Sequence, residues 1–310
     1  MTEATNCWRI GDVKVTRIVE LEMPGIDPAM ILAGVSADDV RRFPWLQPHY
    51  ADGDGQLIVS IHAFVVESRG KRILVDTCVG NDKQRNLPVF HLLNTPFLAR
   101  LGEAGYARSD IDLVLCTHMH VDHVGWNTML VDGRWVPTFP NARYLFARKE
   151  WGHWRAEDPS LGDVTPESSH IVLSPDNVMR DSIQPIIDAG LQELVDEDHR
   201  LTDEVWLMPT PGHTPGHVSL WIRSGESEAV ITGDAMHHPL QIADPDVGSL
   251  TDFERRQARE TRYALLKSCA CKGAMVFGTH FATPAAGRIV GPEGDWRLES
   301  RVAAFSLAKA

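Results

Sequence analysis

The segment that most constrains this chain is a group of histidines that directly follows a short apolar run. The run covers residues 111–116, and the seven residues after it are Thr117-His118-Met119-His120-Val121-Asp122-His123. An apolar run of this length predicts a buried strand. Loops at strand ends present functional groups on a rigid scaffold. We therefore expect a sheet with a polar site just beyond the end of this strand.

The spacing within this group indicates metal binding. His118 and His120 are two residues apart, so in an extended segment they point to the same side. Asp122 and His123 come where the chain should turn into a helix, which would let them face a second ion. Neutral imidazoles and carboxylates suit zinc and related divalent ions. A lone histidine would more often be structural, but a run of ligand-type residues after a strand predicts a metal site.

Three later polar groups also follow predicted strands. They are Pro211-Gly212-His213-Thr214-Pro215-Gly216-His217, Thr232-Gly233-Asp234 and Gly278-Thr279-His280. Two ions held about 3.5 to 4 Å apart need a bridging group, and Asp234 is the best-placed carboxylate. His217 would enter the next strand, so we interpret it as structural.

Periodicity along the chain predicts a layered α/β protein. We expect strands over residues 13–20, 56–67, 72–76, 111–116, 142–146, 205–208, 218–222, 229–232 and 275–278, and helices over 94–104, around 151–154, over 178–187 and over 251–269. Strands alternate with helices in both halves, and no linker divides them. We expect one domain over residues 1–310, with an N-terminal extension and first strand in 1–55 and a motif-bearing core over 57–283.

The charge and residue composition of the chain limit the classes of partner that it can bind. With 30 basic and 42 acidic residues the formal charge is -12, which disfavours nucleic-acid and membrane surfaces. No apolar run reaches the roughly 18 to 20 residues of a membrane span, and residues 1–11 do not read as a secretory signal. The five cysteines lack framework spacing, which favours a reduced, cytoplasmic protein. We expect no nucleic-acid or membrane partner, and a homodimer is left open.

The order of these elements resembles the metallo-β-lactamase superfamily. The resemblance covers residues 57–283 and includes the upstream Val75-Asp76-Thr77. It implies an αββα sandwich of two mixed sheets flanked by helices, with two divalent ions at one edge, zinc first and manganese, cobalt or iron as alternatives. It also implies a first ion on His118, His120 and His213, a second on Asp122, His123 and His280, and Asp234 as the bridge.

One branch of this superfamily is suggested by two further segments. Residues 92–98 and the Gly-Asp-Ala-Met-His237 continuation resemble acyl-homoserine-lactone lactonases and methyl-parathion-hydrolase-like enzymes. Many of these lactonases have a tyrosine three residues after the bridging aspartate, where this chain has His237. An imidazole would thus replace the phenol that contacts the lactone carbonyl.

These observations predict a dinuclear metal-dependent hydrolase of a lactone or other hydrophobic carboxylic ester, using a metal-bridging hydroxide. Asp234 or Asp122 would carry the proton. His237 would contact the substrate oxygen or orient Asp234, with a supporting or merely exposed histidine as the alternative. Asp76 is either a strand-end cap or a hydrogen-bond acceptor for a ligand imidazole. The expected apolar walls of the pocket are Phe64, Phe90, Leu92, Met119, Trp126 and Phe281.

Other functions share this motif. Within the fold, the alternatives are an aryl phosphotriester hydrolase, a thioester hydrolase of the glyoxalase II type and a β-lactamase. The last is disfavoured because the expected setting is cytoplasmic. Outside the class, a metal-dependent nuclease conflicts with the acidic charge. A non-enzymatic metal-stabilised protein would need only four ligands.

Overall fold

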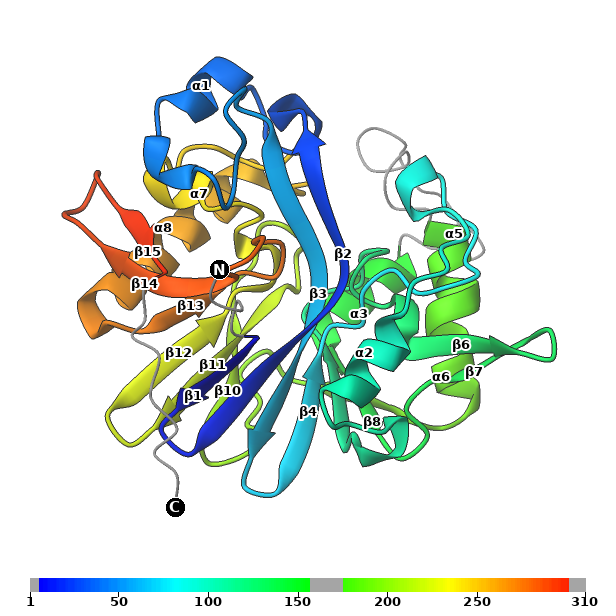
Figure 1. Cartoon of the computed structure of the whole chain (residues 1–310). Coiled ribbons are helices and arrows are strands. Elements are labelled where there is room, and N and C mark those ends of the chain that lie inside the picture. Colours follow the sequence, from blue (N-terminus) through cyan, green and yellow to red (C-terminus); the bar gives the residue numbers. More distant parts are fainter. Residues whose placement is uncertain (1–5, 157–174, 301–310) are drawn as a thin grey trace.

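The apolar runs of the N-terminal half assemble into a seven-stranded sheet. The computed structural model describes residues 6–156 and 175–300 (Figure 1). The strands, in spatial order, are β1 (Cys7–Ile10), β2 (Val13–Ile26), β3 (Leu57–Ser68), β4 (Lys71–Val75), β5 (Leu113–Cys116), β8 (Arg143–Ala147) and β9 (Gln192–Val195). The pairs from β1 to β4 are antiparallel, and those from β4 to β9 are parallel. A tight hairpin joins β3 to β4, where Arg69 and Gly70 both have positive φ.

The C-terminal half builds a second, six-stranded sheet. Its strands are β10 (Val205–Pro209), β11 (Val218–Ser224), β12 (Ser227–Ile231), β13 (Met275–Phe277), β14 (Ala286–Val290) and β15 (Arg297–Glu299). Only the β12–β13 pair is parallel, since α8 connects these two strands. A separate ribbon pairs β6 (Thr128–Val131) with β7 (Arg134–Pro137).

Helices fill the connections. The α-helices are α1 (Ala37–Arg41), α2 (Phe97–Glu103), α3 (Arg148–Ala156), α5 (Pro175–Val178), α6 (Gln184–Asp188), α7 (Leu240–Ala243) and α8 (Arg255–Lys272), and a π-helical turn, η7 (Met179–Ile183), joins α5 to α6. Short 3-10 turns are η1 (Pro28–Met30), η2 (Pro44–Leu46), η3 (Pro88–Phe90), η4 (Arg108–Asp110), η5 (Gly125–Asn127) and η8 (Gly233–Ala235). None of the described helices is long and apolar enough to span a membrane.

Helix α8 begins later than the predicted residue 251. The Glu254 side chain caps its first turn by accepting hydrogen bonds from the backbone N–H groups of Arg256 and Gln257. Gly273, at φ 60°, ends it in the left-handed conformation. Residues 251–253 are thereby left in a loop that reaches the polar site.

Strand alternation separates two hydrophobic clusters and produces the layers. On β5, Leu115 faces the cluster between the sheets, whereas Val114 and Cys116 face the cluster beneath α2, α3 and α6. Between the sheets, the rings of Phe64 and Phe277 meet edge to face at 5.6 Å. Helix α8 covers the outer side of the second sheet (Figure 1). The predicted αββα sandwich of two mixed sheets is confirmed.

Candidate metal centre

The predicted histidine group lies in the turn that leaves β5. The sequence predicts that the chain enters a helix at Asp122, and this is wrong: the chain makes a tight turn there, followed by η5. Gly125 permits this path, because a Cβ there would lie 1.8 Å from the carbonyl oxygen of Val79. The turn directs both His120 and His123 inward, and His123 has no exposed surface.

Two groups of donor atoms converge beside this turn. One combines His118, His120, His213 and Asp234, and the other combines Asp122, His123 and His280. Within each group the donor atoms lie within 4.8 Å of one another, and every residue except the half-buried Asp122 is buried. The structure therefore brings together all seven side chains that the sequence singled out. They come from the loops after β5, β10, β12 and β13.

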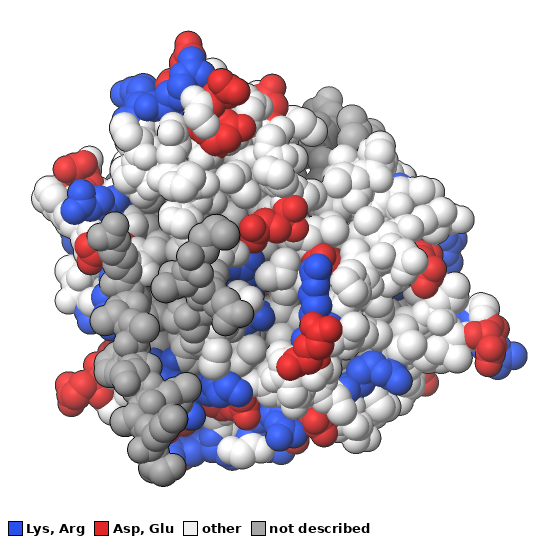
Figure 2. All heavy atoms as spheres, in the orientation of Figure 1, with Lys and Arg blue, Asp and Glu red and all other residues white. Residues whose placement is uncertain are grey.

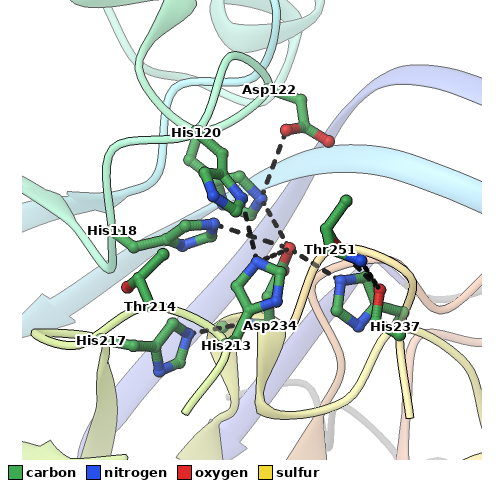
Figure 3. Close-up of polar contacts among 12 residues, drawn as sticks. His118, His120, Asp122, His213, Thr214, His217, Asp234, His237 and Thr251 are labelled. Atoms are coloured by element: carbon green, nitrogen blue, oxygen red, sulfur yellow. Dashed lines mark hydrogen bonds and ion pairs between the residues drawn. The ribbon is translucent and has the colours of Figure 1, made fainter. Parts of the chain in front are cut away.

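Asp234 lies between the two groups. Its Oδ2 atom is 3.4 Å from His213 Nε2 and 3.3 Å from His123 Nε2. Its Oδ1 atom is 3.1 Å from His280 Nε2. In Figure 3 the imidazoles of His118, His213 and His237 surround this carboxylate. A single carboxylate thus lies within 3.4 Å of nitrogen atoms from both groups.

The facing nitrogen atoms fit a cation between them. His213 Nε2 and His120 Nδ1 are 3.0 Å apart, and His280 Nε2 and His123 Nε2 are 3.3 Å apart. His118 Nε2 is buried and makes no hydrogen bond within the described residues. Neutral imidazole nitrogens in this arrangement present lone pairs to the same space, and divalent ions take such donors.

Electrostatics agree with this reading. Burial, together with the charges of neighbouring histidines, holds the pKa values of His118 and His120 well below their usual range. These rings are therefore neutral at pH 7, as ligands must be. Burial lowers the pKa of His123, but the charges of Asp234, Asp76 and Asp122, with the hydrogen bond to Asp234, together raise it well above its usual range. Positive charge is favoured beside these carboxylates.

The second nitrogen of most ligand candidates is fixed by a protein group. Asp76 Oδ2 lies 3.0 Å from His123 Nδ1, and the Ser60 carbonyl lies 3.1 Å from His280 Nδ1. Asp76 also accepts the backbone N–H of Thr117 at 2.8 Å. Both sequence interpretations of Asp76 therefore hold, since it caps the strand end and orients an imidazole.

His217 holds the backbone of Asp234 in place, in keeping with its predicted structural role. Its Nε2 accepts the backbone N–H of Asp234 at 2.8 Å, so its proton sits on Nδ1 and faces the Thr210 carbonyl at 3.1 Å. Burial lowers the pKa of His217 to about 3, which keeps it neutral. Gly233 packs on this ring, since a Cβ there would lie 2.5 Å from His217 Nε2.

The two histidines after Asp234 differ in direction. His237 Nε2 lies 3.2 Å from Asp234 Oδ2, and its buried Nδ1 makes no hydrogen bond within the described residues. His238 turns away, donating from Nε2 to the Tyr50 carbonyl at 2.8 Å and accepting at Nδ1 from Leu240 N. His237 therefore belongs to the centre, and His238 is structural.

Two buried carboxylates of the centre were missed in the sequence. Asp252 lies 3.1 Å from His213 Nδ1. Glu150 accepts hydrogen bonds from Met119 N and Gly216 N, which lie in two different ligand loops. Each is an isolated carboxylate far along the chain from its partners, so no spacing pattern pointed to it.

Of the six predicted apolar wall residues, Leu92 is exposed and the other five are buried. Phe64 and Phe281 have no exposed surface and belong to the core between the sheets, so their assignment to a pocket wall is wrong. Leu92 is 52% exposed. On the first-ion side, the Trp154 ring lies 5.7 Å from the His120 ring.

The sequence profile of the metallo-beta-lactamase superfamily matches residues 58–280, a span that contains both donor groups. This chain belongs to the metallo-beta-lactamase superfamily. Membership was predicted from the order of the ligand motifs, and it is confirmed.

Several proteins of known name resemble this superfamily member. N-acyl homoserine lactonase AiiA of Bacillus thuringiensis subsp. kurstaki is 23% identical over 190 residues, 57% of this chain and 64% of the lactonase. The match thus spans just under two thirds of the lactonase's own length. The crystal structure of hydrolase AbOPH superposes with a TM-score of 0.79 at 24% identity, over 96% of this chain and 98% of that one. AidC, a dizinc quorum-quenching lactonase in complex with a product, gives 0.75 at 20% identity over the same shares.

Proposed function

We propose that this chain is a hydrolase that holds two divalent metal ions and cleaves a lactone or another hydrophobic carboxylic ester. The observation that carries the proposal is the placement of Asp234 in contact with both donor groups. A structural zinc site needs only a closed set of four donors, whereas seven converge in this centre. The named lactonases among the relatives support the same reaction class.

The ligand assignment follows the two groups. His118, His120 and His213 would hold the first ion, Asp122, His123 and His280 the second, and Asp234 would bridge them. A set dominated by neutral imidazoles, with carboxylates between, suits zinc, and manganese, cobalt and iron are the alternatives. Bound divalent ions supply hydroxide at neutral pH and polarise a carbonyl oxygen.

Side chains of the protein would transfer the proton that hydrolysis releases from the attacking water. Hydrolysis adds water across the acyl carbon–oxygen bond, so one proton must pass from the attacking water to the departing alkoxide. Asp122 suits this transfer, because its side chain is 17% exposed and its Oδ2 lies 3.7 Å from His280 Nε2. Asp234 is the second candidate, since it lies between the donor groups. The 3.2 Å contact of His237 with Asp234 favours the orienting role predicted for His237.

A hydrophobic substrate is supported by an exposed aromatic side chain next to the His213 loop, that of Phe253. Phe253 is 58% exposed, its backbone N–H donates to the His213 carbonyl, and its ring meets His153 at 4.9 Å. An acyl chain or aryl group could lie along this edge without displacing a charged residue.

A nuclease fits the surface poorly. Strong nucleic-acid binding needs a continuous basic stripe. On the face shown in Figure 2, Lys and Arg side chains are interspersed with Asp and Glu. Together with the formal charge of -12, this supports a small neutral substrate and no nucleic-acid partner.

The organisation and setting of the chain are proposals of the same kind. One domain over residues 1–310 is supported by a core cluster that runs from Ile10 to Leu298. A reducing, cytoplasmic setting is supported by the five cysteines, all of which are free thiols.

The test is a hydrolysis panel with protein reconstituted separately with zinc, manganese and cobalt. The substrates are aliphatic lactones, aryl esters, an aryl phosphotriester, a cephalosporin and a glutathione thioester. We expect turnover of lactones or esters that is lost on chelation and restored by metal. Absence of turnover on every lactone and ester would refute the proposal, and a preference for another arm would name the alternative.

Asp234→Ala should abolish turnover and lower the metal content below two ions per chain, because it removes the one carboxylate shared by both groups. Elemental analysis after gel filtration measures the second effect. Glu193→Gln is a matched control, since Glu193 is exposed on β9 and forms only a surface ion pair with Arg143. Retention of two ions by the Asp234 variant would show that the bridging assignment is wrong.

A further inference from the structure

The buried carboxylate of Asp252 contacts His213 at Nδ1, the ring nitrogen that does not face the other donor atoms of the metal centre. Its Oδ1 lies 3.1 Å from His213 Nδ1, and its Oδ2 accepts the backbone N–H of Ser249 at 2.8 Å. The carboxylate has no exposed surface. His213 presents its other nitrogen, Nε2, to His120 and Asp234. The imidazole is therefore held between a carboxylate on one side and the donor group on the other.

This contact decides the tautomer of His213. A carboxylate only accepts hydrogen bonds, so the proton of the neutral ring must sit on Nδ1. The lone pair is then on Nε2, the atom that faces the proposed first ion. With the proton on Nε2, the ring could not bind a metal through the atom that points at the centre.

A buried arginine fixes this carboxylate. Arg262 on α8 has no exposed surface, and its Nη2 lies 3.5 Å from Asp252 Oδ2. Its Nε donates to the Ala235 carbonyl at 3.1 Å and its Nη1 to the Pro245 carbonyl at 2.9 Å. Ala235 directly follows the bridging Asp234. One guanidinium thus ties the support of His213 to the turn that carries the bridge.

The N-terminal part of the chain holds the same loop. Ala33 N donates to the Gly248 carbonyl and Leu250 N donates to the Ile31 carbonyl, both at 2.9 Å. The Ser249 that caps Asp252 lies between these two contacts and forms a bridge with Leu32. Residues 31–33 therefore hold the same loop through backbone contacts.

We propose that Asp252, held by Arg262, is a positioning residue that fixes His213 with Nε2 directed at the first ion. The inference rests on the proposed metal centre. The same residues would also keep the His213 loop and the Asp234 turn at a constant separation.

The test compares metal retention in Asp252→Asn and in the unmodified protein. An asparagine amide can donate to Nδ1, which permits the tautomer with the proton on Nε2, and a protonated Nε2 cannot bind the metal. Outer partners of metal-bound histidines typically contribute a factor of about 10 to 100 in affinity. We expect one of two ions to be lost at a chelator concentration about 10 to 100 times lower, and the visible spectrum of the cobalt form to change.

A matched control is Glu204→Gln. Glu204 is also a buried carboxylate, accepting from Ser68 Oγ at 2.8 Å and from Ser224 Oγ at 2.7 Å. Ser68 is eight residues along β3 from Ser60, or about 26 Å at 3.3 Å per residue. This variant should lose stability without changing metal retention. Equal metal loss in both variants, or unchanged retention in Asp252→Asn, would overturn the proposal.

A measurement on the unmodified protein keeps the test independent of folding. Nitrogen-15 NMR of the zinc form should show His213 protonated at Nδ1, with a proton shifted downfield by its carboxylate partner. Protonation at Nε2 would overturn the inference. If the unmodified chain binds no metal, the proposed function fails, whereas two ions with an unaffected Asp252 variant reject only the positioning role.

Discussion

Replacing Glu150 by glutamine should both destabilise the fold and weaken the metal centre. Each carboxylate oxygen accepts two hydrogen bonds. Oε1 accepts from Met119 N at 3.1 Å and from Trp154 Nε1 at 2.7 Å, and Oε2 accepts from Thr214 Oγ1 at 2.7 Å and from Gly216 N at 3.1 Å. A glutamine amide can accept at only one end. In the better orientation its oxygen faces Met119 N and Trp154 Nε1, and its NH₂ group faces Thr214 Oγ1, which can turn to accept, and the backbone N–H of Gly216, which cannot.

The magnitude follows from the one donor, Gly216 N, that loses its acceptor. A buried donor left without a partner costs about 1 to 3 kcal/mol, so the free energy of unfolding should fall by about that amount. The space is closed to an easy rearrangement, since a Cβ on Gly216 would lie 2.0 Å from Glu150 N. Because Met119 and Gly216 belong to different ligand loops, the first ion should also be held less tightly.

Urea unfolding of the metal-free protein, followed by circular dichroism, measures the first effect. Glu197→Gln provides the control, because among the described residues the Glu197 side chain accepts a single, exposed hydrogen bond, from Lys149 N, and its loss should change stability by less than about 1 kcal/mol. A fall of less than about 1 kcal/mol in the Glu150 variant would refute this account of the carboxylate.

Two further substitutions test the turn after β5 and the neutral histidine beside the centre. Gly125→Ala should lower the free energy of unfolding by about 1 to 3 kcal/mol or more, because the new Cβ would lie 1.8 Å from Val79 O. Gly102→Ala on α2 is the control and should be neutral or stabilising, because the space around Gly102 is open. Thermal unfolding of both variants measures the difference. Burial lowers the pKa of His238 from 6.5 to about 4, so between these pH values the unfolded chain protonates this ring more readily than the folded chain does. The neutral ring's contribution to the free energy of unfolding, about 3 kcal/mol, is therefore present above pH 6.5 and lost as the pH falls toward 4. His238→Gln should therefore show a shallower fall in stability between pH 6.5 and 4.5 than the unmodified protein in urea titrations with chelator, and parallel curves would contradict this assignment.

The seven side chains that converge at the candidate metal centre could be predicted because each lies just after an apolar run. The runs before His118, Asp234 and His280 form adjacent or facing strands, so their ends meet at one edge. The strands β1, β9 and β15 were not predicted. They are only three or four residues long, too short for a clear periodic pattern, and pairing with a neighbouring strand defines them as strands.

Side chains that support the ligands follow a different rule. Asp252 and Glu150 act on groups 39 and 31 to 66 residues away, so only the folded chain reveals them. Asp76 was the exception, because it ends a strand next to the one that carries the histidines. Supporting residues are predictable from sequence when they share the strand-end geometry of the ligands they hold.

His237 shows how a correct location can carry two different roles. The sequence places it three residues after Asp234, where lactonases often have a tyrosine, and the structure puts its Nε2 3.2 Å from that carboxylate. A carboxylate oxygen accepts, so the neutral ring donates from Nε2 and keeps a lone pair on Nδ1. A phenol could donate to a substrate carbonyl at this point, but a neutral His237 cannot donate from its remaining nitrogen. Polarisation of the substrate would then depend on the ions alone, and His237→Phe should reduce turnover through the position of Asp234 rather than through loss of a substrate contact.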